Sequence, residues 1–334
     1  MAANRPLLEV ERLRVEFPTR RGTLVAVDDV SFAIAPGEVL GVVGESGAGK
    51  SMTGAAVIGL LEPPGRIAGG EIRLDGRRID NLPYEEMRKV RGKEIGAIFQ
   101  DPLTSLNPLY TIGRQLIETI TTHLDLSQDQ ARKRAIELLQ EVGIPAAERR
   151  IDHYPHQFSG GMRQRVVIAL ALCANPRLII ADEPTTALDV SIQAQIITLL
   201  KRLCRDHGAA IMLVTHDMGV IAETADRVAV MYAGRIAEIG PVHDVIKRAK
   251  HPYTVGLMGS IPKIGQTEAR LAQIDGAMPR LNAIPPGCAF NPRCGRVFER
   301  CRVERPEPRA AGSADVACWL YDDVRAPARA AGDD

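Results

Sequence analysis

The stretch GESGAGKS, Gly44 to Ser51, has the residue types and the spacing that hold the phosphates of a nucleotide. In the pattern GxxxxGK[ST], glycines let backbone N–H groups turn inward toward phosphate oxygens at the start of a helix. Lys50 stands where a lysine reaches the β- and γ-phosphates, and Ser51 where a hydroxyl binds magnesium. The stretch predicts binding of ATP or GTP with Mg²⁺. The expected nucleotide contacts are Gly44, Glu45, Ser46, Gly47, Ala48, Gly49, Lys50, Ser51 and Met52.

A second stretch, LIIADEP from Leu178 to Pro184, is an apolar run that ends in two carboxylates. Asp182 suits the metal, through Ser51 or a water, and Glu183 suits the base that polarises an attacking water. Two acidic residues at the end of a strand can also be ordinary polar residues. The phosphate loop upstream favours hydrolysis of a nucleotide.

The segments around these residues predict a sheet with connecting helices. EVLGVV, Glu38 to Val43, is a short apolar run before the glycine-rich loop, and SMTGAAVIGLL follows the loop at helical spacing. LIIAD and AIMLVTH are apolar runs typical of parallel strands that are covered on both faces. The order strand, loop, helix is the context that a phosphate loop needs.

Two further segments predict antiparallel strands. Near the start of the chain, Leu13, Val15 and Phe17 alternate with charged residues, which is the period of a half-buried strand. The segment RVAVMYAGRIAEIG predicts a hairpin that turns at Ala233 and Gly234.

A helical insert interrupts the strands from Thr111 to about Cys173. Within it, SQDQARKRAIELLQEVG places its apolar residues on one face, behind a capping box of Ser127 and Gln130. The chain therefore mixes strands and helices throughout its first 250 residues, and we expect an α/β fold.

The composition is that of an ordinary globular protein. The 334 residues carry a net charge of +1, without the basic excess that indicates nucleic acid, and we expect no nucleic-acid partner. The longest apolar run, Val166 to Ala174, is about half of what a membrane span needs. The first residues lack the apolar stretch of a secretory signal, so we expect the chain in the cytosol.

The segment FSGGMRQR, Phe158 to Arg165, completes a series of motifs. They run in the order GESGAGKS, Gln100 in IFQDP, SGG, LIIADE, TALD from Thr186 to Asp189, and His216 in VTHD. In this order they resemble the ATP-binding subunit of an ABC transporter, over residues 7 to about 245. The resemblance implies a P-loop ABC ATPase with a mixed sheet core, an antiparallel β-subdomain and a helical subdomain.

The resemblance also implies roles in hydrolysis. Gln100 would sense the γ-phosphate and help to bind magnesium, Glu183 would be the base, and His216 would hydrogen-bond the γ-phosphate. Phe17 stands where the family stacks an aromatic ring on adenine. Val25 is an alternative adenine contact, because a strand phenylalanine is as often part of the core.

A second set of residues would act on the ATP of a partner subunit. In this family the SGG segment opens a helix, which makes an anion site. Its residues here are Ser159, Gly160, Gly161 and Met162. Two chains would clamp two nucleotides head to tail, and Asp189 would reach across the interface between them.

Finer features resemble one branch of the family. Phe158 and Met162 replace more general signature residues, and IFQDPLTSLNP and HPYT are similar to segments of dipeptide and oligopeptide importer subunits. The C-terminal PPGCAFNPRC is similar to that branch's extension. The branch implies an ATPase that drives uptake of small peptides into a bacterial cell.

The same resemblance implies partners and a location. The partners would be two integral membrane permease subunits, a second ATPase, and an extracytoplasmic peptide-binding protein. A heterodimer of ATPases is favoured over a homodimer. The chain would lie peripherally on the cytoplasmic face of the inner membrane. The alternatives are the same machine with nickel, glutathione or another small solute as cargo, and a soluble ABC ATPase of translation or DNA repair.

Four cysteines lie in the C-terminal extension: Cys288, Cys294, Cys301 and Cys318. Their spacing matches neither a zinc ribbon nor a bacterial ferredoxin, so free thiols, zinc and an iron–sulfur cluster all remain open. A short segment with little apolar content needs a cross-link to fold, and disulfides do not persist in a reducing compartment. This favours a bound metal. The resemblance further implies a four-iron (4Fe–4S) cluster, with zinc as the alternative. Cys173 and Cys204 lie in apolar helical runs and are expected in the core.

The predicted domain boundary lies near residue 250. Residues 1–250 would form the ATPase domain, with the helical subdomain at about 101–175. Residues 251–334 would form the small cysteine-containing extension. Its end, RAPARAAGDD, is expected to be disordered.

Overall fold

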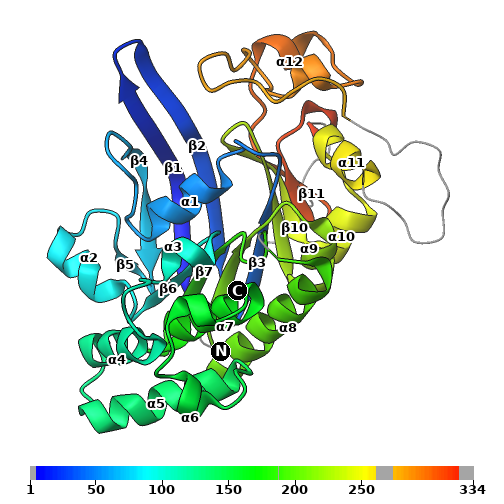
Figure 1. Cartoon of the computed structure of the whole chain (residues 1–334). Coiled ribbons are helices and arrows are strands. Elements are labelled where there is room, and N and C mark those ends of the chain that lie inside the picture. The colour runs from blue at the N-terminus through cyan, green and yellow to red at the C-terminus, as the bar shows by residue number, and fades with distance from the viewer. Residues whose placement is uncertain (1–4, 187, 261–273, 323–334) are drawn as a thin grey trace, which may run out of the picture.

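The computed structural model describes residues 5–186, 188–260 and 274–322. Two sheets and a group of helices make up the fold, so the predicted α/β class with a mixed sheet, an antiparallel sheet and a helical part is confirmed (Figure 1). The tail RAPARAAGDD lies outside the described residues.

The larger sheet has eight strands in the order β11-β12-β10-β9-β3-β8-β7-β6. Strand bounds are β3 (Val39–Val43), β6 (Ile95–Ile98), β7 (Leu178–Asp182), β8 (Ala210–Val214), β9 (Arg227–Tyr232), β10 (Arg235–Pro241), β11 (Arg309–Ala311) and β12 (Ala314–Val316). β6, β7, β8, β3 and β9 pair in parallel, whereas β9, β10, β12 and β11 pair antiparallel. Both faces of β3 are covered, since Val39 and Val43 enter one apolar cluster and Leu40 and Val42 the other.

The smaller sheet is antiparallel and has four strands in the order β2-β1-β4-β5. The strands are β1 (Leu8–Thr19), β2 (Gly22–Ile34), β4 (Arg66–Leu74) and β5 (Arg77–Arg78). Leu13 and Val15 are fully buried while Arg12 is exposed, which confirms the predicted half-buried strand. β1 and β2 form the long blue hairpin of Figure 1.

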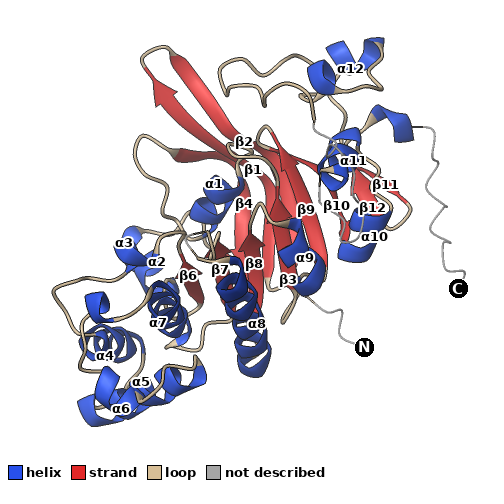
Figure 2. Ribbon diagram, turned by 45° about the vertical axis from the view of Figure 1, so that its right-hand side comes forward, coloured by secondary structure: helices blue, strands red, loops and turns tan. Residues whose placement is uncertain are grey.

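The helical insert lies between β6 and β7 and forms a group of its own (Figure 2). Its helices are α3 (Pro102–Ser105), α4 (Ile112–His123), α5 (Gln128–Glu141), α6 (Ala147–Arg150) and α7 (Gly160–Leu172), with a 3-10 turn at Pro155–Gln157. The predicted capping box is present at the start of α5. The Gln130 N–H donates to Ser127 Oγ at 3.3 Å, and the Ser127 N–H donates to Gln130 Oε1 at 2.9 Å.

The remaining helices pack along the sheets and the extension. They are α1 (Lys50–Val57), α2 (Tyr84–Val90), α8 (Val190–His207), α9 (Met218–Thr224), α10 (Val242–Lys247), α11 (Pro252–Gly259) and α12 (Glu299–Val303), with 3-10 turns at Asn291–Arg293 and Trp319–Tyr321.

Cys173 and Cys204 are buried as predicted, and burial raises the pKa of each thiol to about 12. They are therefore neutral core residues.

The β9–β10 hairpin joins the C-terminal extension to the main sheet. It turns at Ala233 and Gly234, which have φ values of 47° and 81°, as a tight hairpin turn requires. Beyond it, β12 pairs with β10, with Glu238 opposite Val316. The extension therefore contributes β11 and β12 to the eight-stranded sheet (Figure 1).

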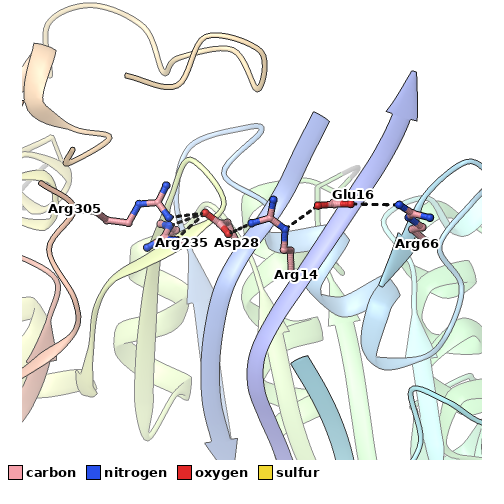
Figure 3. A network of polar contacts seen from close by, with 6 residues as sticks. All are labelled: Arg14, Glu16, Asp28, Arg66, Arg235 and Arg305. Atoms are coloured by element: carbon pink, nitrogen blue, oxygen red, sulfur yellow. Dashed lines mark hydrogen bonds and ion pairs between the residues drawn. The ribbon is translucent and has the colours of Figure 1, made fainter. Parts of the chain in front are cut away.

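Asp28 on β2 is the junction between the two sheets and the extension. Its carboxylate accepts from Arg14 of β1 at 2.8 Å, from Arg235 of β10 at 2.8 Å and from Arg305 of the extension at 2.9 Å (Figure 3). Burial works to raise the pKa of Asp28, but the hydrogen bond and charge of Arg235, with Arg305 and Arg14, outweigh it. The pKa therefore lies below its ordinary 3.8.

We predict that Asp28→Asn lowers the free energy of unfolding by about 1–2 kcal/mol at pH 7, because clustered arginines lose their shared carboxylate. The folded pKa lies below the ordinary 3.8, so the wild-type advantage is complete above 3.8 and disappears as the pH falls through the lower folded value. Urea unfolding over a pH series measures the difference. The control is Asp29→Asn, whose carboxylate makes no ion pair within residues 5–186, 188–260 and 274–322. An equal loss in both variants would contradict the prediction.

Candidate nucleotide-binding and hydrolysis site

The phosphate loop connects β3 to α1, and two of its glycines are required by close backbone contacts. A Cβ at Gly44, where φ is 154°, would lie 2.3 Å from the carbonyl oxygen of Met231. A Cβ at Gly49, where φ is 100°, would lie 2.8 Å from the carbonyl oxygen of Ala26. Any side chain at these positions would push the loop away from β9 or β2. The Gly234 N–H of the hairpin also donates to the Ala48 carbonyl at 2.9 Å.

Lys50 is held inside this loop. Its side chain is only 5% exposed, and Nζ donates to the carbonyl oxygens of Gly44 at 2.9 Å and Glu45 at 3.1 Å. Burial lowers the pKa of Lys50, while the nearby carboxylates of Glu183 and Asp182 act to raise it. The ammonium group is thus fixed at the loop, whereas Ser46 and Gly47 of the same loop are exposed.

Ser51 and Asp182 form the pair of oxygen ligands that the sequence predicts for magnesium. The Ser51 hydroxyl donates to Asp182 Oδ1 at 3.0 Å, joining the start of α1 to the end of β7. Burial raises the pKa of Asp182, and the hydrogen bond from Ser51 opposes that rise. A hydroxyl and a carboxylate side by side fit a hard cation that takes oxygen ligands.

Glu183 brings together the residues that were predicted for catalysis. Gln100 Nε2 donates to Glu183 Oε2 at 3.2 Å, and His216 Nδ1 lies 3.4 Å from Glu183 Oε1. Glu183 itself has a φ of 46°, and its N–H donates to the Val214 carbonyl at 2.8 Å. The backbone turn at the end of β7 therefore directs the Glu183 carboxylate toward Gln100 and His216.

Thr186 is a site residue that the sequence reasoning left without a role. Its hydroxyl donates to Glu183 Oε2 at 2.8 Å, on the same carboxylate oxygen that Gln100 contacts. Thr186 opens the TALD motif, so its position after Glu183 is the signal that could have indicated this contact.

The signature residues lie apart from the phosphate loop of their own chain. Ser159 caps α7 and accepts the N–H of Met162 at 3.4 Å, and both Ser159 and Gly160 are exposed. Asp189 is exposed at the start of α8. Within the described part of the chain, no hydrogen bond joins residues 159–162 to residues 44–51. The first N–H groups of an exposed helix can bind an anion, and here the anion would come from another chain.

Phe17 lies on β1, where it is half-buried. A Cβ at Gly65 would lie 2.7 Å from a carbon of its ring, and Phe17 packs against the apolar cluster beneath the antiparallel sheet. Val25 is half-buried and precedes Ala26, whose carbonyl meets Gly49. The contact of Phe17 with adenine stays a prediction, and so does that of Val25.

The four extension cysteines line one small cavity together with His251, Phe290 and Trp319. Burial raises the pKa of Cys288 to about 11, and the other three thiols contribute to that rise. Within the described residues none of the four forms a disulfide. In the parts that the structure describes, no three His, Cys, Asp or Glu side chains are grouped closely enough to hold one metal ion. The described residues therefore do not support the predicted metal binding, whether as zinc or as an iron–sulfur cluster.

The described helices include none with the length and apolar character to cross a membrane.

Comparison with known proteins agrees with this geometry. Residues 27–186 match the family described as ABC transporter, and residues 237–301 match the oligopeptide/dipeptide transporter C-terminal region. The chain is 47% identical to the dipeptide transport ATP-binding protein DppD of Bacillus subtilis over 98% of both chains. It is 49% identical to the oligopeptide transport ATP-binding protein OppD of Salmonella typhimurium, over 90% of this chain and 89% of that one.

A solved structure supports the same conclusion. The dimeric post-hydrolysis state of an ATP-binding cassette bound to ADP and Pi matches with a TM-score of 0.63 and 30% identity, over 70% of this chain and 98% of that one. The chain belongs to the ABC transporter family, among its dipeptide and oligopeptide transport ATP-binding proteins.

Proposed function

We propose that this chain is the ATP-hydrolysing subunit of an importer that takes dipeptides or oligopeptides across the bacterial cytoplasmic membrane. The observation that carries the ATPase is the cluster of Gln100, Thr186 and His216 around Glu183, beside the buried Lys50. The peptide cargo is inferred from the relatives, which are named for dipeptide and oligopeptide transport.

The site supports a reaction in which water attacks the γ-phosphorus of ATP, giving ADP and phosphate. Lys50 binds the β- and γ-phosphates, replacing its bonds to loop carbonyls. Glu183 polarises the water and accepts its proton, while Gln100 and His216 position the water and the γ-phosphate. Ser51 and Asp182, with Gln100, would hold Mg²⁺, which neutralises the developing phosphate charge when bound.

The exposed start of α7 supports a dimeric clamp. Ser159, Gly160, Gly161 and Met162 would bind the ATP held by the phosphate loop of a partner, and Asp189 would contact that partner. The solved ATP-binding cassette that this chain resembles is itself a dimer. ATP binding would close the two chains, and hydrolysis would release them. A second, homologous ATPase is favoured as the partner.

A surface groove of about 420 Å³ beside Gln100 supports docking to membrane subunits. It is lined by Phe99, Thr104 and Leu170 among others. Phe99 is 45% exposed and Leu103 of α3 is 62% exposed, although both are large and apolar. We assign this groove to a cytoplasmic segment of one of the two permease subunits, and the corresponding surface of the second ATPase to the other. The chain would then lie peripherally on the cytoplasmic face of the membrane, and an extracytoplasmic binding protein would deliver the peptide.

The division of the chain at about residue 250 remains part of the proposal, and the extension would carry a 4Fe–4S cluster. This proposal rests on the cavity lined by all four cysteines, because a cluster keeps its thiolates farther apart than one ion does. Zinc would need its ligand atoms to converge at about 2.3 Å from one point. Cys288, Cys294, Cys301 and Cys318 would be the cluster ligands.

The assignment of Glu183 predicts a separation of binding from hydrolysis. Glu183→Gln should keep ATP binding, lower phosphate release by about 100-fold or more, and accumulate closed dimers with ATP. Lys50→Ala should instead lose ATP binding and with it the dimers. Phosphate release and sedimentation of each variant measure these effects. Wild-type hydrolysis by Glu183→Gln would show that Glu183 is not the base.

The groove predicts which proteins accompany the chain. Tagged Glu183→Gln protein, purified with ATP from native membranes in mild detergent, should bring two multi-span membrane proteins and a second ATPase. Adding Leu103→Asp should abolish their recovery, because it places a charge next to Thr104 at the border of an apolar docking surface. The matched control adds Val303→Asp, which alters an apolar residue of the extension that is 71% exposed, against 62% for Leu103. Recovery of the chain alone, or with ribosomal or DNA-repair proteins, would remove the transport function.

The cluster proposal predicts about four irons and four sulfides per chain in protein purified without air. Cys301→Ser should lose both, whereas Cys173→Ala, which alters a core thiol, should keep them. Iron and labile-sulfide analysis gives the answer. Background iron in the parent protein would contradict the cluster, and stoichiometric zinc would favour the alternative.

A further inference from the structure

The C-terminal extension reaches the phosphate loop at Glu45, far away in the sequence. The Glu45 N–H donates to the Tyr253 hydroxyl at 2.9 Å. One guanidinium nitrogen of Arg293 donates to both Glu45 carboxylate oxygens, at 3.0 and 3.1 Å. Met278 of the extension also lies over the loop, because a Cβ at Gly47 would stand 3.4 Å from its terminal methyl. The loop is thus contacted on its backbone and on its one charged side chain besides Lys50.

Arg293 is held rigidly for this contact. Its side chain is 7% exposed, and its other nitrogens donate to the carbonyl oxygens of Asp275 at 2.9 Å and Ile274 at 3.3 Å. Its guanidinium lies 5.8 Å from the ring centre of Tyr232 and 5.9 Å from that of Phe290. Burying an arginine is costly unless its charge is paired, and Glu45 supplies that charge. A surface ion pair formed by chance would lack these further bonds.

The contacts of Glu45 with Tyr253 and Arg293 bear on ATP binding through Lys50 and through the charge of the loop. Its carbonyl oxygen accepts from Lys50 Nζ at 3.1 Å, so the position of Glu45 helps to set that of the ammonium group. Its carboxylate belongs to the loop that surrounds the nucleotide phosphates, and it is 30% exposed. A carboxylate without a counter-charge there would repel the polyphosphate, whereas a buried arginine cancels the repulsion.

We propose that Arg293 and Tyr253 are positioning residues for ATP binding, supplied by the extension to the phosphate loop. Tyr253 fixes the backbone of Glu45, and Arg293 neutralises the Glu45 side chain and draws it away from the phosphates. The loop motif is therefore incomplete without residues that follow the ATPase motifs in the chain. This inference rests on ATP binding alone and not on the peptide cargo.

The test is the dissociation constant for MgATP of the full-length protein, measured by competition with a fluorescent ATP analogue. Arg293→Gln should raise it about tenfold at low salt, because the Glu45 charge is released. The loss should shrink at high ionic strength, since salt screens an exposed repulsion. Arg293→Lys keeps the charge and should recover most of the affinity.

A double variant separates this role from a structural one. Glu45→Gln combined with Arg293→Gln removes both charges and should bind ATP more tightly than Arg293→Gln alone. If the double variant is as weak as the single one, Arg293 acts only on folding and the proposal is wrong. The matched control is Arg300→Gln in the same extension, which pairs with Glu304 and Asp322 rather than with the loop or Asp28 and should leave the affinity within about twofold.

Tyr253→Phe tests the second contact and serves also if Arg293→Gln fails to fold. It keeps the ring and removes only the acceptor for the Glu45 N–H, so we expect about a fivefold weaker affinity for MgATP. Unfolding midpoints of all variants show which are folded. Wild-type affinity in folded Tyr253→Phe and folded Arg293→Gln would overturn the proposal, and if Arg293→Gln is unfolded, wild-type affinity in Tyr253→Phe would overturn it alone.

Discussion

The backbone of the phosphate loop lies so close to two neighbouring strands that glycine is the only residue possible at the contacts. Gly44 meets the carbonyl of Met231 on β9, and Gly49 meets that of Ala26 on β2. Gly234, in the turn after β9, links the loop to β2. Its N–H donates to the Ala48 carbonyl of the loop, and its carbonyl accepts from the Asp28 N–H of β2, each at 2.9 Å. The loop is therefore shaped by both sheets at once, and the catalytic side chains depend on this shape.

The hydrolytic residues are brought to the loop by strand ends of the larger sheet. Asp182 is the last residue of β7 and Glu183 follows it, while His216 follows β8 and Gln100 follows β6. Three adjacent parallel strands therefore end at the same edge. Carboxyl ends of parallel strands are where α/β proteins bind ligands. Gln100 also lies in the segment between β6 and α3, the first helix of the insert. Phe99, which lines the groove, is therefore the neighbour in sequence of a residue of the reaction centre.

Local patterns in the sequence were sufficient for the parts whose structure is local. The strand, loop and helix around Lys50, the capping box of Ser127, and the hairpin turn at Ala233 depend on neighbouring residues, and they appear as predicted. The motif residues Asp182, Glu183, Gln100 and His216 carried recognisable signals, and the structure brings them together.

Other features had no local signal. β12 has three residues, too few for an alternating pattern, although it extends the main sheet. Arg293 and Glu45 are 248 residues apart. Arg293 resembles an ordinary surface charge in the sequence, and nothing there pairs it with Glu45 of the phosphate loop. The same holds for the pairing of Arg305 with Asp28. Such pairs arise when distant segments pack, so neither periodicity nor spacing predicts them.

The contact between the first and last parts of the chain has a consequence for its synthesis. The ribosome completes residues 44–51 early, yet Tyr253 and Arg293, which hold Glu45, are added much later. Domains generally fold from the N-terminus as the chain emerges. In this protein the nascent chain must extend past residue 293 before the phosphate loop gains all its contacts. The contacts that we assign to nucleotide affinity would therefore be complete only after residue 293 has left the ribosome.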